Sequence, residues 1–208
     1  LNYQRFSVFS CPSNFIKMSS NIVITSPIVS VAWLHENLQA HNLIILDGTI
    51  NKVFDLSLEQ IPNARFFDIK KKFSDVSNPF PSAFPSAEQF QKSARDLGIN
   101  QESALVVYDD KGIYSSARVW WLFKAFGFNN VAVLNGGFPE WKKAKYAIEL
   151  MWNYEGERGN FTANLQSNYV QFFNDIQNAS TNKTHIIIDA RSSGRFNCEV
   201  PEPREGLR

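Results

Sequence analysis

Cysteine is scarce in this sequence, and the scarcity limits both its disulfide chemistry and its expected cellular setting. Only Cys11 and Cys198 occur among 208 residues, and they lie far apart in the chain. Two thiols do not make the disulfide framework on which small secreted proteins depend. We therefore expect a protein of a reducing compartment, with the cytoplasm as the default.

Net charge and long apolar runs are also lacking. The sequence carries 21 basic and 20 acidic residues, a net charge of +1, which gives no reason to expect nucleic acid or an anionic membrane as a partner. No apolar run approaches the roughly 18 residues that a membrane-spanning helix needs. His35, His41 and His185 do not cluster with cysteines or acids at metal-ligand spacing. The sequence thus predicts no metal, no cofactor, no nucleic acid and no membrane partner.

What the sequence contains is an alternation of helical and extended segments. Ser30 is placed to cap a helix at 31–40, and Ser86 with Gln89 forms a capping box for a helix at 87–97. Further helices are expected at 117–126 and within 135–144. The runs between them are apolar without alternation, at 43–49, 104–108 and 131–134, which is typical of strands buried on both faces. This pattern predicts an α/β fold, a doubly wound parallel sheet with helices on both faces.

A repeat in this order indicates a second domain. The strand sequence LIILDGT at 43–49 is echoed by IIIDARS at 186–192, and each follows a helix-like segment. The second copy is therefore expected to begin with a strand and to be incomplete at Arg208. We predict an N-terminal extension at 1–21, expected to be disordered, and a first domain at 22–150. A linker at 151–167 and the start of a second domain of the same kind at 168–208 complete this prediction.

The stretch VVYDDKGIYSSARVWW at 106–121 places a short loop between a strand and an aromatic helix. Such a loop offers backbone N–H groups to an anion. Asp109 and Asp110 stand at the end of the strand, where a reactive residue would be expected. Two interpretations stay open: the Asp109 carboxylate fills the cradle of N–H groups, or both aspartates form a solvated turn.

Several motifs resemble one family, the tandem-domain sulfurtransferases of the rhodanese type, which act on thiosulfate or 3-mercaptopyruvate. They are VSVAWL at 29–34, IPNARFFDI at 61–69, the loop at 107–121, LNGGFPEW at 134–141 and DARSSGRFNCEVPEPREGL at 189–207. The resemblance implies that both domains share the rhodanese fold and that only the second carries the catalytic cysteine. Asp109, Asp110 and Arg118 would then belong to the degenerate loop of a silent first domain. No residue of the sequence is expected to be catalytic, and the nucleophilic cysteine is expected beyond Arg208.

Arg195 and Arg204 are the substrate-binding candidates. The resemblance implies that they bind the carboxylate and keto oxygen of the substrate, a task that suits a planar guanidinium, and Arg204 favours 3-mercaptopyruvate over thiosulfate. Loop arginines that only form surface ion pairs are the alternative. Arg191 is interpreted as structural. Cys198 lies between the two candidates, either as a thiol with a lowered pKa or as a tolerated small residue.

Two positions depart from the family pattern. Gln60 and Asn63 stand where the family often has His and Gly, so a role for that histidine cannot be transferred to this chain.

The resemblance implies a sulfurtransferase that moves a sulfane sulfur through a cysteine persulfide. The donor would be 3-mercaptopyruvate or thiosulfate, and the acceptor cyanide or a thiol, with thioredoxin as a further candidate. The 208 residues alone are expected to be inactive. A non-catalytic rhodanese-like binding module is the alternative. A phosphatase-like use of the fold is disfavoured because it needs a cysteine loop with an arginine, which this sequence lacks.

Overall fold

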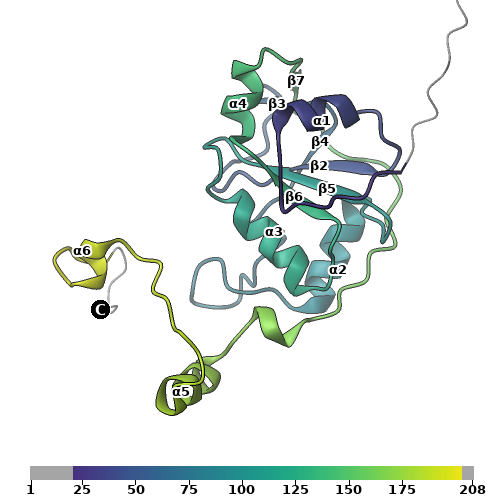
Figure 1. Ribbon diagram of the computed structural model, residues 1–208. Coiled ribbons are helices and arrows are strands. Elements are labelled where there is room, and N and C mark those ends of the chain that lie inside the picture. Colours follow the sequence, from purple (N-terminus) through teal and green to yellow (C-terminus); the bar gives the residue numbers. More distant parts are fainter. Residues whose placement is uncertain (1–20, 203–208) are drawn as a thin grey trace, which may run out of the picture. The chain divides into compact units, whose positions relative to one another are not determined.

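The computed structural model of the chain describes residues 21–202 (Figure 1). These residues belong to two compact units, of which the first ends at Gln166 and the second begins at Ser167. Apart from Asn21, the extension predicted at 1–21 lies outside the described residues, as do Cys11 and Arg204. Nearly all of the predicted linker at 151–167 is part of the first unit.

The first unit is built on a five-stranded parallel sheet with the strand order β1-β6-β5-β2-β4. The strands are β1 (Ile28–Val29), β2 (Leu43–Asp47), β4 (Ala64–Phe66), β5 (Ala104–Tyr108) and β6 (Val131–Leu134). A separate antiparallel pair consists of β3 (Glu59–Gln60) and β7 (Glu149–Leu150). The predicted α/β class with a parallel central sheet is confirmed.

Helices cover both faces of this sheet (Figure 1). On one face lie α1 (Val31–Asn37) and α4 (Gly137–Lys143), and on the other lie α2 (Ala87–Asp96) and α3 (Ser116–Ala125). Successive strand side chains alternate between the two cores, because Leu46 and Val107 pack with α2 and α3 whereas Ile45 and Val106 pack with α1 and α4. Burial on both faces explains why these strands are continuously apolar.

The helix caps explain where α1 and α2 begin. The Ser30 hydroxyl accepts the N–H of Trp33 at 3.1 Å, and the Ser86 hydroxyl accepts the N–H of Gln89 at 3.1 Å. The predicted capping box is nevertheless only half formed. The Gln89 side chain donates to the Ser74 carbonyl at 2.8 Å, because the preceding loop lies close enough to use its amide.

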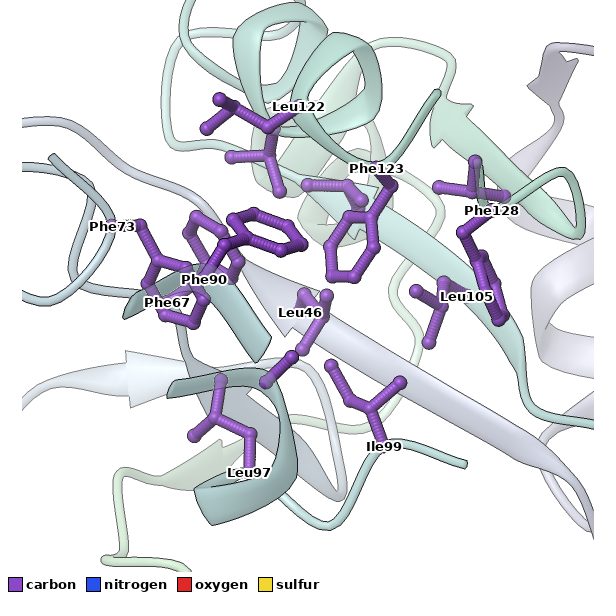
Figure 2. Packing of buried hydrophobic residues seen from close by; sticks show 14 of the residues in the cluster. Leu46, Phe67, Phe73, Phe90, Leu97, Ile99, Leu105, Leu122, Phe123 and Phe128 are labelled. Atoms are coloured by element: carbon purple, nitrogen blue, oxygen red, sulfur yellow. The ribbon is translucent and has the colours of Figure 1, made fainter. Parts of the chain in front are cut away.

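The larger core, on the side of α2 and α3, is dominated by phenylalanine. Phe67 stacks on Phe73 with ring centroids 3.5 Å apart, and Phe90 stacks on Phe126 at 4.4 Å. Figure 2 shows Phe67, Phe73 and Phe90 gathered with Phe123 over the strand that carries Leu46. Aromatic side chains bury a large area each and favour offset or edge-to-face contacts. This core packs α2 and α3 against the sheet.

The second unit contains helices and extended segments. They include the 3₁₀-helix η1 (Ser167–Tyr169), α5 (Phe173–Asn182) and the short α6 (Ser193–Phe196). The strand predicted at 186–192 is wrong for this structure, because no described segment pairs with these residues. Ile186 and Ile188 are 91% and 82% exposed. Apolar sequence alone does not make a strand, which also needs a neighbour for its backbone groups.

Candidate functional site

The loop that follows β5 folds around the carboxylate of Asp109, which is completely buried. One carboxylate oxygen, Oδ1, accepts the N–H of Lys111 at 2.9 Å. The other, Oδ2, accepts the N–H groups of Tyr114, Ser115 and Ser116 at 2.8, 3.0 and 2.9 Å and the Ser116 hydroxyl at 2.6 Å. Since Ser116 begins α3, the carboxylate also lies at the positive end of that helix. This geometry is that of a filled cradle.

The hydrogen bonds also set the protonation of Asp109. Burial by itself raises the pKa of a carboxyl, but the donors from Ser116, Tyr114 and Lys111 outweigh it and leave the pKa of Asp109 below its usual value. Asp110, in contrast, is exposed, and its backbone N–H donates to Thr49 Oγ1 at 3.1 Å. The two neighbouring aspartates therefore have different environments, and only Asp109 occupies the cradle.

Loops from β2 and β6 close around the cradle at the carboxyl edge of the sheet. After β2, the N–H of Ile50 donates to Ser115 Oγ at 3.1 Å. After β6, the N–H of Phe138 donates to the Asp109 carbonyl at 2.9 Å. Gly137 has φ +53°, and a Cβ there would lie 2.4 Å from the Asp109 carbonyl oxygen, so only glycine fits.

A buried ion pair stands beside this loop. Lys52 Nζ lies 2.5 Å from Asp47 Oδ2, and Asp47 is completely buried at the end of β2. The other oxygen, Asp47 Oδ1, accepts the N–H and the hydroxyl of Thr49 at 3.0 and 2.6 Å. The sequence did not single out this pair, although the Asp-Gly step after an apolar strand was visible. It fixes the loop that contacts Asp110 and Ser115.

Arg118 lies on the first turn of α3 and engages the Pro-rich loop. Its Nη2 donates to the Ser82 carbonyl at 2.5 Å, and its guanidinium lies 5.8 Å from the ring centroid of Trp121. Desolvation lowers the pKa of Arg118. Its Nε is buried without a hydrogen-bond partner among the described residues. The structure therefore places Arg118 against the loop at 78–85, and no hydrogen bond in the described part of the chain joins it to the Asp109 carboxylate.

The two positions that depart from the family pattern meet at one acid that sequence reasoning missed. Gln60 is buried and its Nε2 donates to Glu149 Oε1 at 2.9 Å, and the Asn63 N–H donates to the same oxygen at 2.8 Å. Trp152 Nε1 donates there as well, at 2.7 Å. Asn63 has φ +63°, a conformation that favours glycine or asparagine. These contacts attach β3 to β7, and nothing in the sequence pattern marks so distant a pairing.

In the second unit, a charged cluster gathers around Glu202. Arg191 Nη1 lies 2.6 Å from Glu202 Oε1, and Arg195, on α6, donates through Nε at 3.1 Å and through Nη2 to Glu202 Oε2. Arg191 also pairs with Asp189, its Nε lying 2.8 Å from Oδ2. Hydrogen bonds from Arg195 and Arg191 hold the pKa of Glu202 below its usual value, and bonds from Arg191 do the same for Asp189.

The remaining candidates of the second unit are only partly placed. Arg204 lies outside the described residues. Cys198 is an exposed free thiol with φ +59°, and its N–H donates to the Arg195 carbonyl at 3.3 Å. No contact of its sulfur with a guanidinium occurs among the described residues. The left-handed backbone at Cys198 suits a small residue such as glycine.

Other kinds of site are scarce among residues 21–202. No group of three or more His, Cys, Asp or Glu side chains in this part of the chain could hold a metal ion. None of the helices described for it is long and apolar enough to span a membrane.

Comparison with known proteins identifies the family. The family described as Rhodanese-like domain matches residues 30–144. The mitochondrial thiosulfate/3-mercaptopyruvate sulfurtransferase 1 of Arabidopsis thaliana is 35% identical over 217 residues, covering 91% of this chain and 57% of the relative. The 3-mercaptopyruvate sulfurtransferase of Escherichia coli is 35% identical over 192 residues, covering 88% of this chain and 68% of the relative. The chain thus spans well under the full length of these curated relatives.

A solved structure gives the same result. The Escherichia coli 3-mercaptopyruvate sulfotransferase SseA superposes with a TM-score of 0.77 at 34% identity, over 88% of this chain and 72% of that one. The family resemblance predicted from the motifs is confirmed, and the parallel sheet with helices on both faces is the rhodanese fold. The chain belongs to the rhodanese family.

Proposed function

We propose that the protein takes part in sulfur transfer from 3-mercaptopyruvate or thiosulfate to cyanide or a thiol. The observation that carries this proposal is the 35% identity to sulfurtransferases over 91% of the chain, a match that extends into the second unit. The first unit, 22–150 with the segment at 151–166, would be the silent domain, and residues 168–208 would begin the catalytic one.

The cradle supports different roles for the two domains. Sulfur transfer needs a thiolate that attacks the outer sulfur of the donor and holds it as a persulfide. The carboxylate of Asp109 already satisfies the donors of the cradle and has no sulfur to exchange. We therefore assign the nucleophile to a cysteine outside these 208 residues, on the matching loop of the second domain.

With 3-mercaptopyruvate as the donor, the first step transfers the substrate sulfur to the thiolate and releases pyruvate. The thiolate attacks the substrate sulfur, the sulfur–carbon bond breaks, and its electron pair enters the enolate of pyruvate, which takes up a proton. A guanidinium that faces the substrate carboxylate and keto oxygen binds the substrate and stabilises this enolate. Arg195 is our candidate for this role, together with Arg204. A second thiolate, free or on thioredoxin, then takes the outer sulfur of the persulfide.

We further propose that the reaction takes place in the cytoplasm, since a persulfide cycle needs free thiols and the chain has only two cysteines. The Arabidopsis relative, by its name, is mitochondrial. Fractionation of host cells with an antibody against the first unit distinguishes the two compartments, and recovery with a mitochondrial marker would contradict the cytoplasmic assignment.

The proposed function is tested with protein purified from its native host. We expect that 3-mercaptopyruvate or thiosulfate supports thiocyanate formation from cyanide, and that one cysteine peptide gains a single sulfur atom after incubation with donor alone. Donor preference decides between the two substrates. If the native protein forms neither thiocyanate nor a persulfide with either donor, the non-catalytic binding module replaces this proposal.

A further inference from the structure

The arrangement of hydrogen bonds in the charged cluster of the second unit suggests a role for Glu202. Its carboxylate is held from two sides, by Arg191 through Oε1 and by Arg195 through Oε2. Arg191 is itself fixed by Asp189, to which its Nε donates at 3.1 and 2.8 Å. The residues form a chain from Asp189 through Arg191 and Glu202 to Arg195, in which each charged group fixes the next.

The Arg195 guanidinium is used along one edge only. Its Nε and Nη2 both donate to Glu202 Oε2. A guanidinium has a second edge, formed by Nη1 and Nη2, that can bind a carboxylate through two parallel N–H groups. Among the described residues, no side chain or carbonyl accepts from Nη1 of Arg195. One edge is therefore anchored, and the Nη1 side of the other, here called the open edge, has no acceptor in the part of the chain that the structure describes.

The exposed fractions of the Glu202 and Arg195 side chains and the charge balance of the cluster also support a role for Glu202 in holding Arg195. The Glu202 side chain is 7% exposed, whereas the Arg195 side chain is 35% exposed. The Glu202 side chain is therefore more shielded from solvent than the side chain of Arg195. Two arginines balance two acids in the cluster, so a further anion would be held by the hydrogen bonds of the open edge and not by surplus charge.

We propose that Glu202 is a positioning residue, which anchors one edge of Arg195 so that the open edge receives the carboxylate of a small 2-oxo acid. The choice of a 2-oxo acid rests on the proposed function. Without the anchor, Arg195 samples several rotamers and must be ordered when the ligand binds, which costs affinity. The replacement Glu202→Gln keeps the shape of the side chain but removes the charge that holds both arginines, and it should weaken binding on the order of tenfold.

The test uses the 208-residue chain and pyruvate, a 2-oxo acid without a transferable sulfur. Titration is followed through the ¹⁵N signal of Arg195 Nε, which reports on the guanidinium itself and which a purely structural defect elsewhere would not move. Glu199→Gln is the matched control, because Glu199 lies in the same loop and, among the described residues, its side chain accepts a hydrogen bond only from Asn197 Nδ2, at 3.3 Å. We expect wild type and Glu199→Gln to bind alike and Glu202→Gln to bind on the order of tenfold more weakly.

Two results would overturn the inference. Equal or tighter binding by Glu202→Gln would mean that Glu202 is idle or competes with the ligand, and a wild-type Arg195 signal that pyruvate does not shift would mean that this edge binds no 2-oxo acid. If Glu202→Gln unfolds the second unit, Arg191→Lys decides instead, since it loosens Glu202 without touching Arg195 and should also weaken binding. The sulfur-transfer assay is separate. An inactive native protein whose chain shows the predicted binding loss would refute the function and keep the inference, and an active protein without the loss would do the opposite.

Discussion

Replacing Asp109 by asparagine removes the charge from the cradle while keeping the size of the side chain. The amide oxygen can take the place of Oδ2 and accept its donors, but the amide NH₂ then faces the N–H of Lys111. Hydrogen bonds to a charged group contribute about 1.5–3 kcal/mol, and neutral ones contribute less. The loss of charge over these contacts and one donor–donor conflict should lower the free energy of unfolding by about 3 kcal/mol.

The assay for this change is denaturant unfolding followed by tryptophan fluorescence. All five tryptophans, at positions 33, 120, 121, 141 and 152, lie in the first unit, so the signal reports on that unit alone. The melting temperature should fall by roughly 10 °C. Asp110→Asn is the control, since Asp110 is exposed and its replacement should change the unfolding free energy by less than about 0.5 kcal/mol.

The pH dependence of the same pair gives a second check. Because the folded-state pKa of Asp109 is lowered, its carboxylate contributes stability fully at pH values above the unfolded pKa of about 3.9. That contribution is lost as the pH falls through the folded pKa. The difference between wild type and Asp109→Asn should therefore be constant near neutrality and shrink below about pH 4. A variant as stable as wild type at pH 7 would refute the filled cradle.

Three further substitutions test the loop around Asp109 and the aromatic core. Gly137→Ala should lower the unfolding free energy by about 2 kcal/mol or more, measured in the same fluorescence assay, because its Cβ would meet the Asp109 carbonyl at a positive φ; an unchanged midpoint would contradict the close approach. Phe90→Ala should cost about 3–5 kcal/mol, since Phe90 is fully buried and contacts several rings; a cost below about 1 kcal/mol would mean that the aromatic core is loosely packed. Asp109→Cys should place a thiol among the same donors and lower its pKa below about 8.5, measured from the pH dependence of the thiolate ultraviolet absorbance; a pKa at or above about 8.5 would mean that the cradle does not stabilise a thiolate.

Local signals in the sequence were enough to predict helices α1 to α4 and strands β2, β5 and β6. Ser30 and Ser86 cap helices where expected, and the continuously apolar runs became β2, β5 and β6. The short pairs were not foreseen, because β3 and β7 have two residues each and are joined through Glu149, far away in the sequence. The strand expected at 186–192 failed for a related reason, since no described segment supplies its partner.

The candidate site was predictable in its residue types but not in its geometry. The loop after β5 could be recognised from the sequence as a place for an anion. Whether the Asp109 carboxylate fills that place could not be decided from the sequence, because the contacts around it involve Gly137, in the loop after β6, and Ser115, which is bonded to the loop after β2. Arg195 was singled out by the family motif. Its partner Glu202 was not, because it lies seven positions further along the chain, beyond the end of α6, and no periodicity brings the two residues together.

The position of Asp109 also explains how a loop shaped to bind an anion can be stable without an external ligand. Three N–H groups and a hydroxyl converge on a single buried oxygen, and without an acceptor each would remain unpaired at a cost of about 1–3 kcal/mol. A catalytic loop can leave this role to a thiolate or a bound substrate. Here the acceptor belongs to the chain, so the loop is complete when the domain folds and fastens β2, β5 and β6 at one edge. The cradle thereby contributes to the stability of the domain.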